Sequence, residues 1–300
     1  LNKIWNANNF LVQNSCDFTD TSKPEQINEN INKWIITEFL LVKENIQKNI
    51  NNYRFDEAAK NVYQFVWHSF CDWYLELSKT IYYSDNQSSK DETRDVSAYV
   101  FREILILLHP FIPFITEEVW LKNKLDKNSK DYLMFANWSE DKGKTDKSHI
   151  EVNKIIDFIT SIRSFKNELG VPPGSLIEIS LEKTSNEIKN FVDKNNTILM
   201  KLGRIKNIST KDLNKSSASL ILEGELFKIY FEEDVDLNRV KDTLNKKLDK
   251  LKKEMDKINH RLTNKNFVEK APAELIDQEK TTFNNLEKDV KKIQLTLENL

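Results

Sequence analysis

The sequence predicts a mainly α-helical protein with three parts: a helical bundle, a small α+β connector and a C-terminal antiparallel coiled-coil hairpin. Three patterns support this fold class. Apolar residues recur at helical spacing through about the first 140 residues, alternate at strand spacing in short runs after residue 176, and follow a heptad rhythm from about residue 236. These changes of period place the three parts at residues 1–149, 150–235 and 236–300.

Helical spacing of apolar residues predicts the first two helices of the bundle, over Leu1–Gln13 and around the stripe Ile31–Ile46. Asp56 is a favourable cap for a third helix, which continues to Leu77. Residues 67, 71 and 74 widen the apolar stripe of that helix, which indicates that it packs on two sides. The polar segment Tyr83–Thr93 predicts a loop before a further helix over residues 96–108.

A proline-rich corner follows that helix. Pro110 and Pro113 lack a backbone donor and disfavour helical conformation in the preceding residue, so the helix ends near Leu108. Thr116 is predicted to cap the next helix, with the acidic pair 117–118 in its electropositive first turn. The segment therefore forms an apolar corner between two packed helices.

The connector begins with an amphipathic helix, Ile150–Leu169, which Gly170 and the Pro-Pro-Gly sequence at 172–174 end. Alternating apolar residues then predict a strand over 177–181, and a helical stretch follows around residues 188–192. Further strands are predicted near residues 205–208, 220–222 and 227–231.

The last part shows coiled-coil spacing in two runs, from Leu237 to Leu262 and from Phe283 to Leu300. The segment Thr263–Pro272 separates them and breaks the first helix with its Asn residues and its proline. Two arms of similar length joined by a short link favour an antiparallel hairpin, with arms roughly 40 Å long at about 1.5 Å rise per residue.

Composition excludes several classes of protein. The chain has only five glycines and no G-x-G pair, which excludes a Rossmann or P-loop nucleotide site. Two isolated cysteines fit a reducing compartment and form neither a disulfide framework nor a zinc site. The sequence shows no apolar run of transmembrane length and no signal peptide, so we expect no membrane partner. Because it opens inside an amphipathic helix, we interpret it as part of a longer protein.

The small net charge of −2 conceals a gradient along the chain. Residues 1–140 carry 15 Lys and Arg against 20 Asp and Glu, whereas residues 236–300 carry 15 against 12. The segment Arg239–Arg261 has nine basic and four acidic residues. A basic stripe on a helix fits a polyanionic partner, and it fits a solvated coiled-coil face equally well.

No group of side chains indicates catalysis or metal binding. Asp72 and Glu76 lie one helical turn apart, and we interpret them as salt-bridge partners or as part of a solvated face. The four histidines show no metal-ligand spacing. We expect His109 to make a hydrogen bond in the proline corner and Cys71 to be a buried small side chain.

Four segments, taken together, resemble the valyl-tRNA synthetase family. They are the opening Leu1–Ala7, the segment from Tyr53–Ala59 to Phe70–Leu77, the proline corner, and Asn266–Glu274 at the end of the hairpin. The proline corner alone also resembles the isoleucyl and leucyl enzymes, whereas the sequence of Cys71–Glu76 and the hairpin segment favour the valyl enzyme. The resemblance covers nearly all 300 residues but is weak from about 175 to 235.

This resemblance implies that the chain is the tRNA-binding part of a class I aminoacyl-tRNA synthetase, and that this enzyme acts in the cytoplasm. The parent enzyme would use ATP with Mg²⁺ to join valine to tRNA(Val). Neither a His-Ile-Gly-His-like nor a Lys-Met-Ser-Lys-Ser-like motif occurs here, so the resemblance implies that the Rossmann catalytic domain and the editing domain lie elsewhere in the same chain. We therefore expect no catalytic residue and no cofactor in these 300 residues.

The resemblance also implies two RNA contacts, one with the anticodon loop and one with the tRNA elbow. For each aromatic candidate, packing in the core is the favoured alternative to base stacking. Arg163 and Lys166, three apart on one helix face, suit phosphate contacts better. Lys246, Lys250, Lys253 and Lys257 recur at spacings of four, three and four and predict a basic ridge. The anticodon candidates are Arg54, Phe55, Trp73, Arg102, Arg163 and Lys166, and the elbow candidates are Lys246, Lys250, Lys253, Lys257, Arg261 and Lys280.

One alternative stays open on the sequence: a non-catalytic helical interaction module whose hairpin binds protein, because a charged ridge beside an apolar seam suits either partner. Preferential binding of tRNA(Val) over other tRNAs would distinguish the two functions. A fragment of an isoleucyl or leucyl enzyme is disfavoured by the sequence of Cys71–Glu76 and by the segment Phe267–Pro272.

Overall fold

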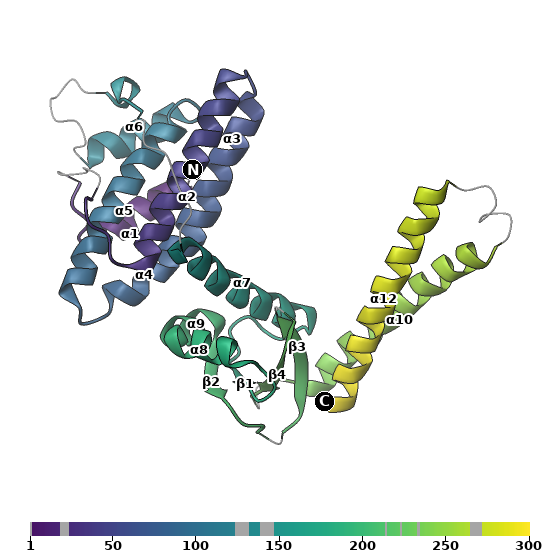
Figure 1. Cartoon of the computed structure of the whole chain (residues 1–300). Helices are drawn as coiled ribbons and strands as arrows, with labels where there is room; N and C mark the ends of the chain where they lie inside the picture. Colours follow the sequence, from purple (N-terminus) through teal and green to yellow (C-terminus); the bar gives the residue numbers. More distant parts are fainter. Residues whose placement is uncertain are drawn as a thin grey trace. The chain divides into compact units, whose positions relative to one another are not determined.

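The computed structural model describes residues 2–18, 24–123, 132–138, 147–213, 215–222, 224–232, 235–264 and 272–300. It confirms a mainly α-helical fold with a small four-stranded sheet and a C-terminal helical hairpin (Figure 1). Contacts divide the chain into two compact units, residues 1–156 and 157–300. None of the helices in the described ranges combines the length and apolar character needed to cross a bilayer.

The first unit is a bundle of helices around an aromatic core. Its members are α1 (Asn2–Gln13), α2 (Asn30–Asn51), α3 (Phe55–Gln64), the π-helix η1 (Phe65–Tyr74), α4 (Leu75–Tyr82), α5 (Gln87–Leu108), α6 (Pro113–Lys122) and the 3₁₀ turn η2 (Leu133–Phe135). The segments α3, η1 and α4 form one continuous helix over residues 55–82. Phe65 and Phe70 on this helix are buried against Phe39 of α2 and Phe101 of α5, with ring centroids 6.1 and 6.0 Å apart.

A buried polar network ties α2 and α5 to this continuous helix. The Tyr74 hydroxyl lies 3.1 Å from Ser97 Oγ on α5, and the Tyr82 hydroxyl of α4 lies 2.8 Å from the same atom. On α2, the Asn32 amide donates to Thr93 Oγ1 at 3.0 Å and to the Glu92 carboxylate at 2.9 Å. Buried polar groups that all find partners fix one arrangement of helices, because each alternative would leave a donor or acceptor unsatisfied.

The loop predicted over residues 83–93 is present only at residues 83–86, and its second half is wrong because α5 already begins at Gln87. Asn86 caps this helix by accepting a 3.2 Å hydrogen bond from the Ser89 backbone. The positions that face the core in the first two turns are Ser89 and Thr93, so this part of the helix is buried without apolar periodicity. The predicted cap at Asp56 is also wrong: α3 begins one residue earlier and is preceded by Arg54, with Asp56 in its first turn.

The proline corner bends as predicted, but its second helix begins earlier than expected. Pro113 occupies the first position of α6, where its missing N–H costs nothing. Thr116 is therefore not the cap; its buried hydroxyl donates to the carbonyls of Ile112 and Pro113 at 3.0 and 3.1 Å. Residues 117–118 consequently lie beyond the first turn. The predicted hydrogen bond of His109 is confirmed, since its Nδ1 lies 2.9 Å from Thr116 Oγ1.

The helix α7 (Lys147–Glu168) begins in the first unit, where residues 147–156 hydrogen-bond to α2. Trp34 donates to Asn153 at 3.0 Å, and His149 lies 2.6 Å from the Glu38 carboxylate. The remainder of α7 belongs to the second unit. Gly170, in the left-handed conformation at φ 69°, follows its end as predicted.

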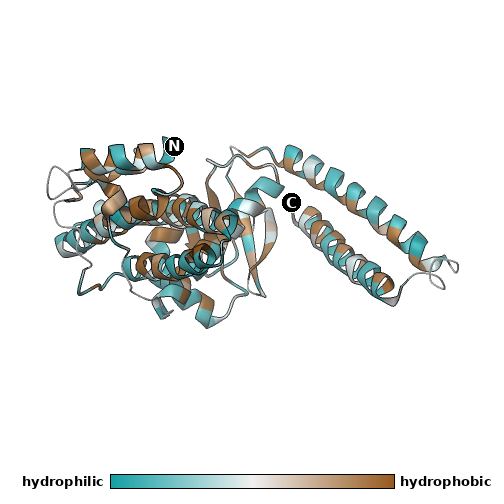
Figure 2. Cartoon of the chain, turned by 90° about the horizontal axis from the view of Figure 1, so that it is seen from above, coloured by the Kyte–Doolittle hydropathy of each residue, from teal (hydrophilic) through white to brown (hydrophobic). Residues whose placement is uncertain are grey.

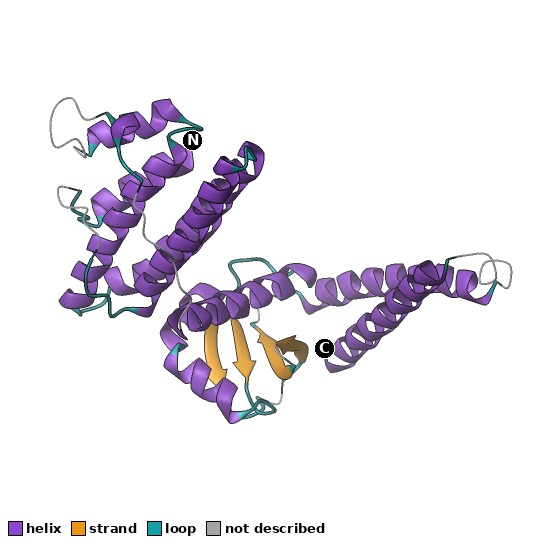
Figure 3. Cartoon of the chain, turned by 45° about the horizontal axis from the view of Figure 1, so that its top comes forward, coloured by secondary structure: helices purple, strands orange, loops and turns teal. Residues whose placement is uncertain are grey.

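The second unit contains a mixed sheet, whose strands are orange in Figure 3. The order of the strands is β2-β1-β4-β3. Its strands are β1 (Ile177–Ser180), β2 (Ile205–Ser209), β3 (Ser217–Leu222) and β4 (Glu225–Phe231). β1 runs parallel to β2 and antiparallel to β4, and α8 (Asn186–Lys194) and α9 (Asn196–Gly203) connect the parallel pair. Phe158 of α7 packs edge-to-face on Phe227 of β4 at 5.6 Å, so α7 covers the sheet.

The hairpin consists of α10 (Leu237–Thr263) and α12 (Ala273–Asn299). The residues of its predicted seam are buried or half-buried, and hydrophobic and hydrophilic residues alternate along both helices (Figure 2). The base of α10 is joined to the end of α7 by an ion pair of 3.0 Å between Lys247 and Glu168. Residues 265–271, which make up most of the predicted link Thr263–Pro272, lie outside the described residues.

Candidate nucleic-acid interface

An exposed aromatic turn joins α2 to α3. Tyr53 adopts the left-handed conformation at φ 60°, which is uncommon for a residue other than glycine, and the Arg54 amide donates to the Asn49 carbonyl at 2.8 Å. This turn leaves Tyr53 83% exposed and Phe55 56% exposed, with their rings edge-to-face at 6.3 Å. Arg54 lies between them in sequence, with its guanidinium 3.8 Å from Glu57. Two accessible rings and a cation suit the bases and phosphates of a single-stranded loop.

A second aromatic surface lies further along the same helix, where α3 continues into η1. The rings of Tyr63 and Trp67 stack with centroids 4.7 Å apart and planes inclined by 20°. Tyr63 is exposed, and it lies outside the apolar stripe of its helix. We did not predict this pair as a site; an exposed aromatic residue one turn from a tryptophan was the signal that could have found it.

The other two candidates of the bundle are less accessible. Trp73 is half-buried on η1, in line with the packing alternative. Arg102 lies over the ring of Trp120 at 5.5 Å and pairs with Glu103 at 2.5 Å. Phe55 and Trp73 lie eighteen positions apart on one continuous helix, which separates them by roughly 25 Å at about 1.5 Å per residue. The structure therefore does not join them in one site.

The acidic pair on this helix has the structural role that the sequence predicts. Asp72 pairs with Lys3 at 2.6 Å, and Glu76 pairs with Lys79 at 2.5 Å. Burial raises the pKa of the Cys71 thiol from 9.0 to about 12, so this half-buried thiol stays protonated, as expected of a packing residue. Within the described ranges, no group of His, Cys, Asp and Glu side chains could hold a metal ion.

Arg163 and Lys166 have different surroundings. Arg163 is exposed, and its guanidinium donates to the Leu202 carbonyl at 3.0 Å. Lys166 is only 3% exposed, and its ammonium donates to the carbonyls of Pro173 and Ser175 at 3.1 and 2.5 Å. The interpretation of Lys166 as a surface phosphate contact is therefore wrong, since its charge holds the protein's own backbone. Helical spacing alone could not reveal this, because the residues that bury Lys166 come from the following loop.

The basic ridge of the hairpin lies on the exposed side of α10. The four ridge lysines are all exposed: Lys246, Lys250, Lys253 and Lys257. The seam residues of the same helix are buried, and they face a buried seam on α12. These residues are Val240, Leu244, Leu248 and Ile258 on α10 and Leu286, Val290 and Ile293 on α12. The apolar seam thus holds the helices together and leaves the ridge free to meet a polyanion.

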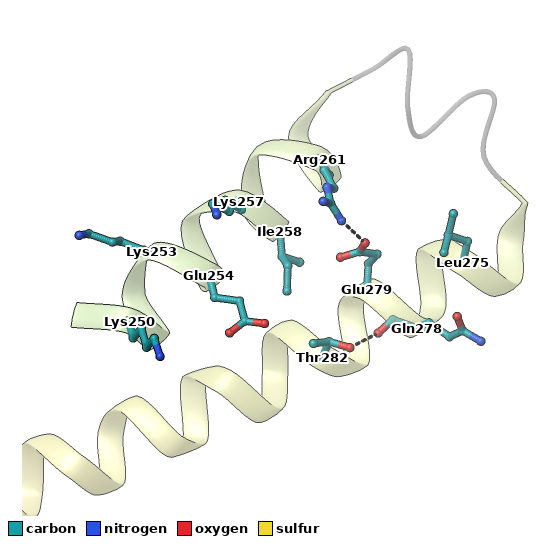
Figure 4. Close-up of a pocket in the computed structure, with 10 residues that line it drawn as sticks. All are labelled: Lys250, Lys253, Glu254, Lys257, Ile258, Arg261, Leu275, Gln278, Glu279 and Thr282. Atoms are coloured by element: carbon teal, nitrogen blue, oxygen red, sulfur yellow. Dashed lines mark hydrogen bonds and ion pairs between the residues drawn. The ribbon is translucent and has the colours of Figure 1, made fainter. Parts of the chain in front are cut away.

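Near its tip the hairpin contains a groove of about 600 Å³ (Figure 4). Lys250, Lys253 and Lys257 contribute to its lining on the α10 side, and Gln278 does so on the α12 side. Arg261 spans the two helices by donating to the Glu279 carboxylate at 2.8 Å. Lys280, the remaining elbow candidate, is exposed on α12. Most of the predicted basic residues therefore lie on one accessible part of the hairpin.

Comparison with known proteins supports an RNA-binding role for both regions. A family model described as the anticodon-binding domain of tRNA ligase matches residues 32–181. A second model, described as the valyl tRNA synthetase tRNA binding arm, matches residues 236–300. The first match includes the exposed aromatic turn, and the second includes the whole hairpin.

Among the similar proteins are three valine–tRNA ligases. That of Pelagibacter ubique is 55% identical over 300 residues, covering 100% of this chain and 34% of the relative. Those of Bartonella quintana and Zymomonas mobilis are each 33% identical, covering 99% of this chain and 33% and 34% of the relatives. The chain thus spans about a third of the length of these relatives, and it matches their C-terminal part.

Proposed function

The chain belongs to the valyl-tRNA synthetase family, and from this premise we propose that it positions tRNA(Val) for aminoacylation by a valine–tRNA ligase. The bundle contacts the anticodon loop, and the hairpin contacts the elbow, where the loops of the tRNA meet. Binding at two distant places fixes the orientation of the RNA as well as its position.

One observation carries this proposal: two consecutive tRNA-binding regions of the family each present accessible side chains suited to RNA. In the bundle these are Tyr53, Arg54 and Phe55 at the turn before α3. In the hairpin they are the ridge lysines. Because residues 1–140 carry more acidic than basic side chains, we expect the bundle to bind through local stacking and hydrogen bonds, and the hairpin to supply the salt-dependent attraction.

The remaining chemistry belongs to the rest of the proposed ligase. A Rossmann domain would activate valine with ATP and Mg²⁺, and an editing domain would remove wrongly attached amino acids. We propose that the ligase acts in the cytoplasm and that this 300-residue chain supplies tRNA binding without forming valyl-adenylate.

A nuclease footprint of tRNA(Val) on this chain tests the proposal. We expect protection of the anticodon loop and of the elbow, and weaker protection of a tRNA with another anticodon. The double variant Lys250→Glu with Lys253→Glu should lose protection at the elbow and keep it at the anticodon loop. Equal footprints on unrelated tRNAs, or protection at neither place, would overturn the proposal and would favour a protein-binding role for the hairpin.

A further inference from the structure

A cavity of about 450 Å³ lies in the second unit beside the C-terminal half of α7. The loop at residues 171–174 forms one wall, and the end of α9 forms another. Three of its nine lining residues are basic, namely Arg163, Lys166 and Arg204, and Asn167 adds an amide. Among these described lining residues there is no acidic side chain. The cavity therefore has the electrostatic character of a site for an anion.

Two of the basic side chains hold the walls in place. Lys166 joins α7 to the loop through the carbonyls of Pro173 and Ser175. Arg163 joins α7 to the end of α9 through the Leu202 carbonyl. Because both walls are fixed to one helix by charged hydrogen bonds, the cavity is formed before any ligand arrives, which lowers the entropic cost of binding.

The third basic residue occupies an unusual backbone position. Arg204 follows the last residue of α9 in the left-handed conformation, at φ 55° and ψ 49°. This position after a helix normally carries glycine, because a side chain is strained there. Strain of this kind is often found at functional sites, and here it places an exposed arginine at the cavity.

We propose that this cavity binds a phosphate group of the RNA backbone, as a third contact of the chain with its tRNA. This inference rests on the proposed function. Arg204 supplies a charged fork that is accessible to the phosphate, Asn167 supplies an additional donor, and the buried charge of Lys166 makes the cavity more positive. The volume lies within the range of small-molecule sites and accommodates a phosphate with its sugar.

The variant Arg204→Gly separates binding from folding. It removes the cation and also relieves the left-handed strain, so the melting temperature should be unchanged or higher. Affinity for tRNA(Val) should fall about tenfold at moderate salt, as expected for the loss of one charge-assisted contact. The slope of log Kd against log salt should decrease by roughly one. The control is Lys183→Gly, which removes an exposed charge from the same unit outside the cavity.

The outcomes distinguish this inference from the proposed function. If wild type binds tRNA(Val) and Arg204→Gly binds it as tightly as Lys183→Gly does, the phosphate site is wrong while the proposed function stands. Titration with inorganic phosphate, followed by the amide resonances of residues 203–205, gives an independent readout. Saturable shifts in wild type that vanish in Arg204→Gly would support the site even if tRNA binding failed, and shifts equal in both proteins would overturn it.

Discussion

The Tyr74 hydroxyl donates a 2.9 Å hydrogen bond to the side-chain oxygen of Asn32, across the interior of the bundle. Both residues are fully buried, and they lie on two different helices, η1 and α2. Burial raises the pKa of Tyr74 far above its ordinary value, so the hydroxyl remains a donor under all physiological conditions. This bond belongs to the polar network that joins α2, η1, α4 and α5.

We expect Tyr74→Phe to destabilise the protein. The substitution keeps the ring but leaves the Asn32 oxygen without this donor, which costs about 1–3 kcal/mol of unfolding free energy. Urea unfolding followed by circular dichroism measures the change. Tyr63→Phe is the matched control, because the Tyr63 side chain is exposed and its loss of a hydroxyl should change stability by less than about 0.5 kcal/mol. Equal stability of the two variants would contradict a structural role for the network.

The ridge of α10 should govern the salt dependence of RNA binding. Lys250→Glu with Lys253→Glu should weaken tRNA binding strongly and reduce the slope of log Kd against log salt by roughly two, because two phosphate contacts are lost. Helicity should not change, since both side chains are exposed. Lys288→Glu with Lys291→Glu makes the same change of charge on α12 away from the ridge. If this second pair lowers the slope equally, the effect is one of net charge and the ridge has no specific role.

The turn before α3 should contribute base stacking. We expect Phe55→Ala to lower affinity for an anticodon stem-loop about tenfold, within the range of one stacked base, because truncation removes the exposed ring. Thermal stability should change little, since the ring buries little apolar area. Fluorescence anisotropy with a labelled stem-loop measures the affinity. The control is Tyr132→Ala, which truncates an exposed aromatic side chain outside this turn and should bind the stem-loop like wild type. If Phe55→Ala binds with the affinity of wild type, Phe55 is not part of the interface.

Stability should fall in alkaline solution. Burial raises the pKa of Cys16 from 9.0 to about 11 and that of Cys71 from 9.0 to about 12. The unfolded chain therefore releases these protons above about pH 9, while the folded chain retains them. The contribution of the two thiols to the free energy of unfolding is fully present below pH 9 and declines as the pH rises toward 12. Cys71→Ala should lose less unfolding free energy between pH 8 and pH 10 than wild type does. A loss equal to that of wild type would show that this thiol ionises normally in the folded protein.

The fold was largely predictable because most of its elements follow apolar periodicity. The coiled-coil seam is the clearest case, since Val240, Leu244, Leu248 and Ile258 are buried and the seam residues between Leu248 and Ile258 are half-buried. The beginning of α5 could not be found in this way, because its core-facing residues are Ser89 and Thr93, which are buried through hydrogen bonds. Pro113 shows a second limit: a proline can follow the end of one helix or occupy the first position of the next, and only the backbone shows which.

The candidate interface was harder to predict than the fold. Spacing along one helix correctly predicted that the ridge lysines are exposed, because their exposure depends only on that helix and the one helix that packs against it. Lys166 was misassigned for the opposite reason, since its exposure depends on a loop that folds back over α7. Tyr53 is accessible because of a left-handed turn, which its residue type does not signal. The exposure of a side chain can thus be inferred from sequence where it depends on the periodicity of one helix. It cannot be inferred where it depends on a turn or loop that brings other residues close.

The π-helical winding of residues 65–74 restricts how the bundle can rearrange. In an α-helix, Phe65 and Phe70 would point about 140° apart, because each residue turns the helix by about 100°. The wider winding keeps both rings in the interior, one toward α2 and the other toward α5. Rewinding this stretch as an ordinary helix would change the angle between the two rings, so the contacts with α2 and α5 could not both be kept unless those helices moved as well. The winding thus couples the positions of α2 and α5 to one another.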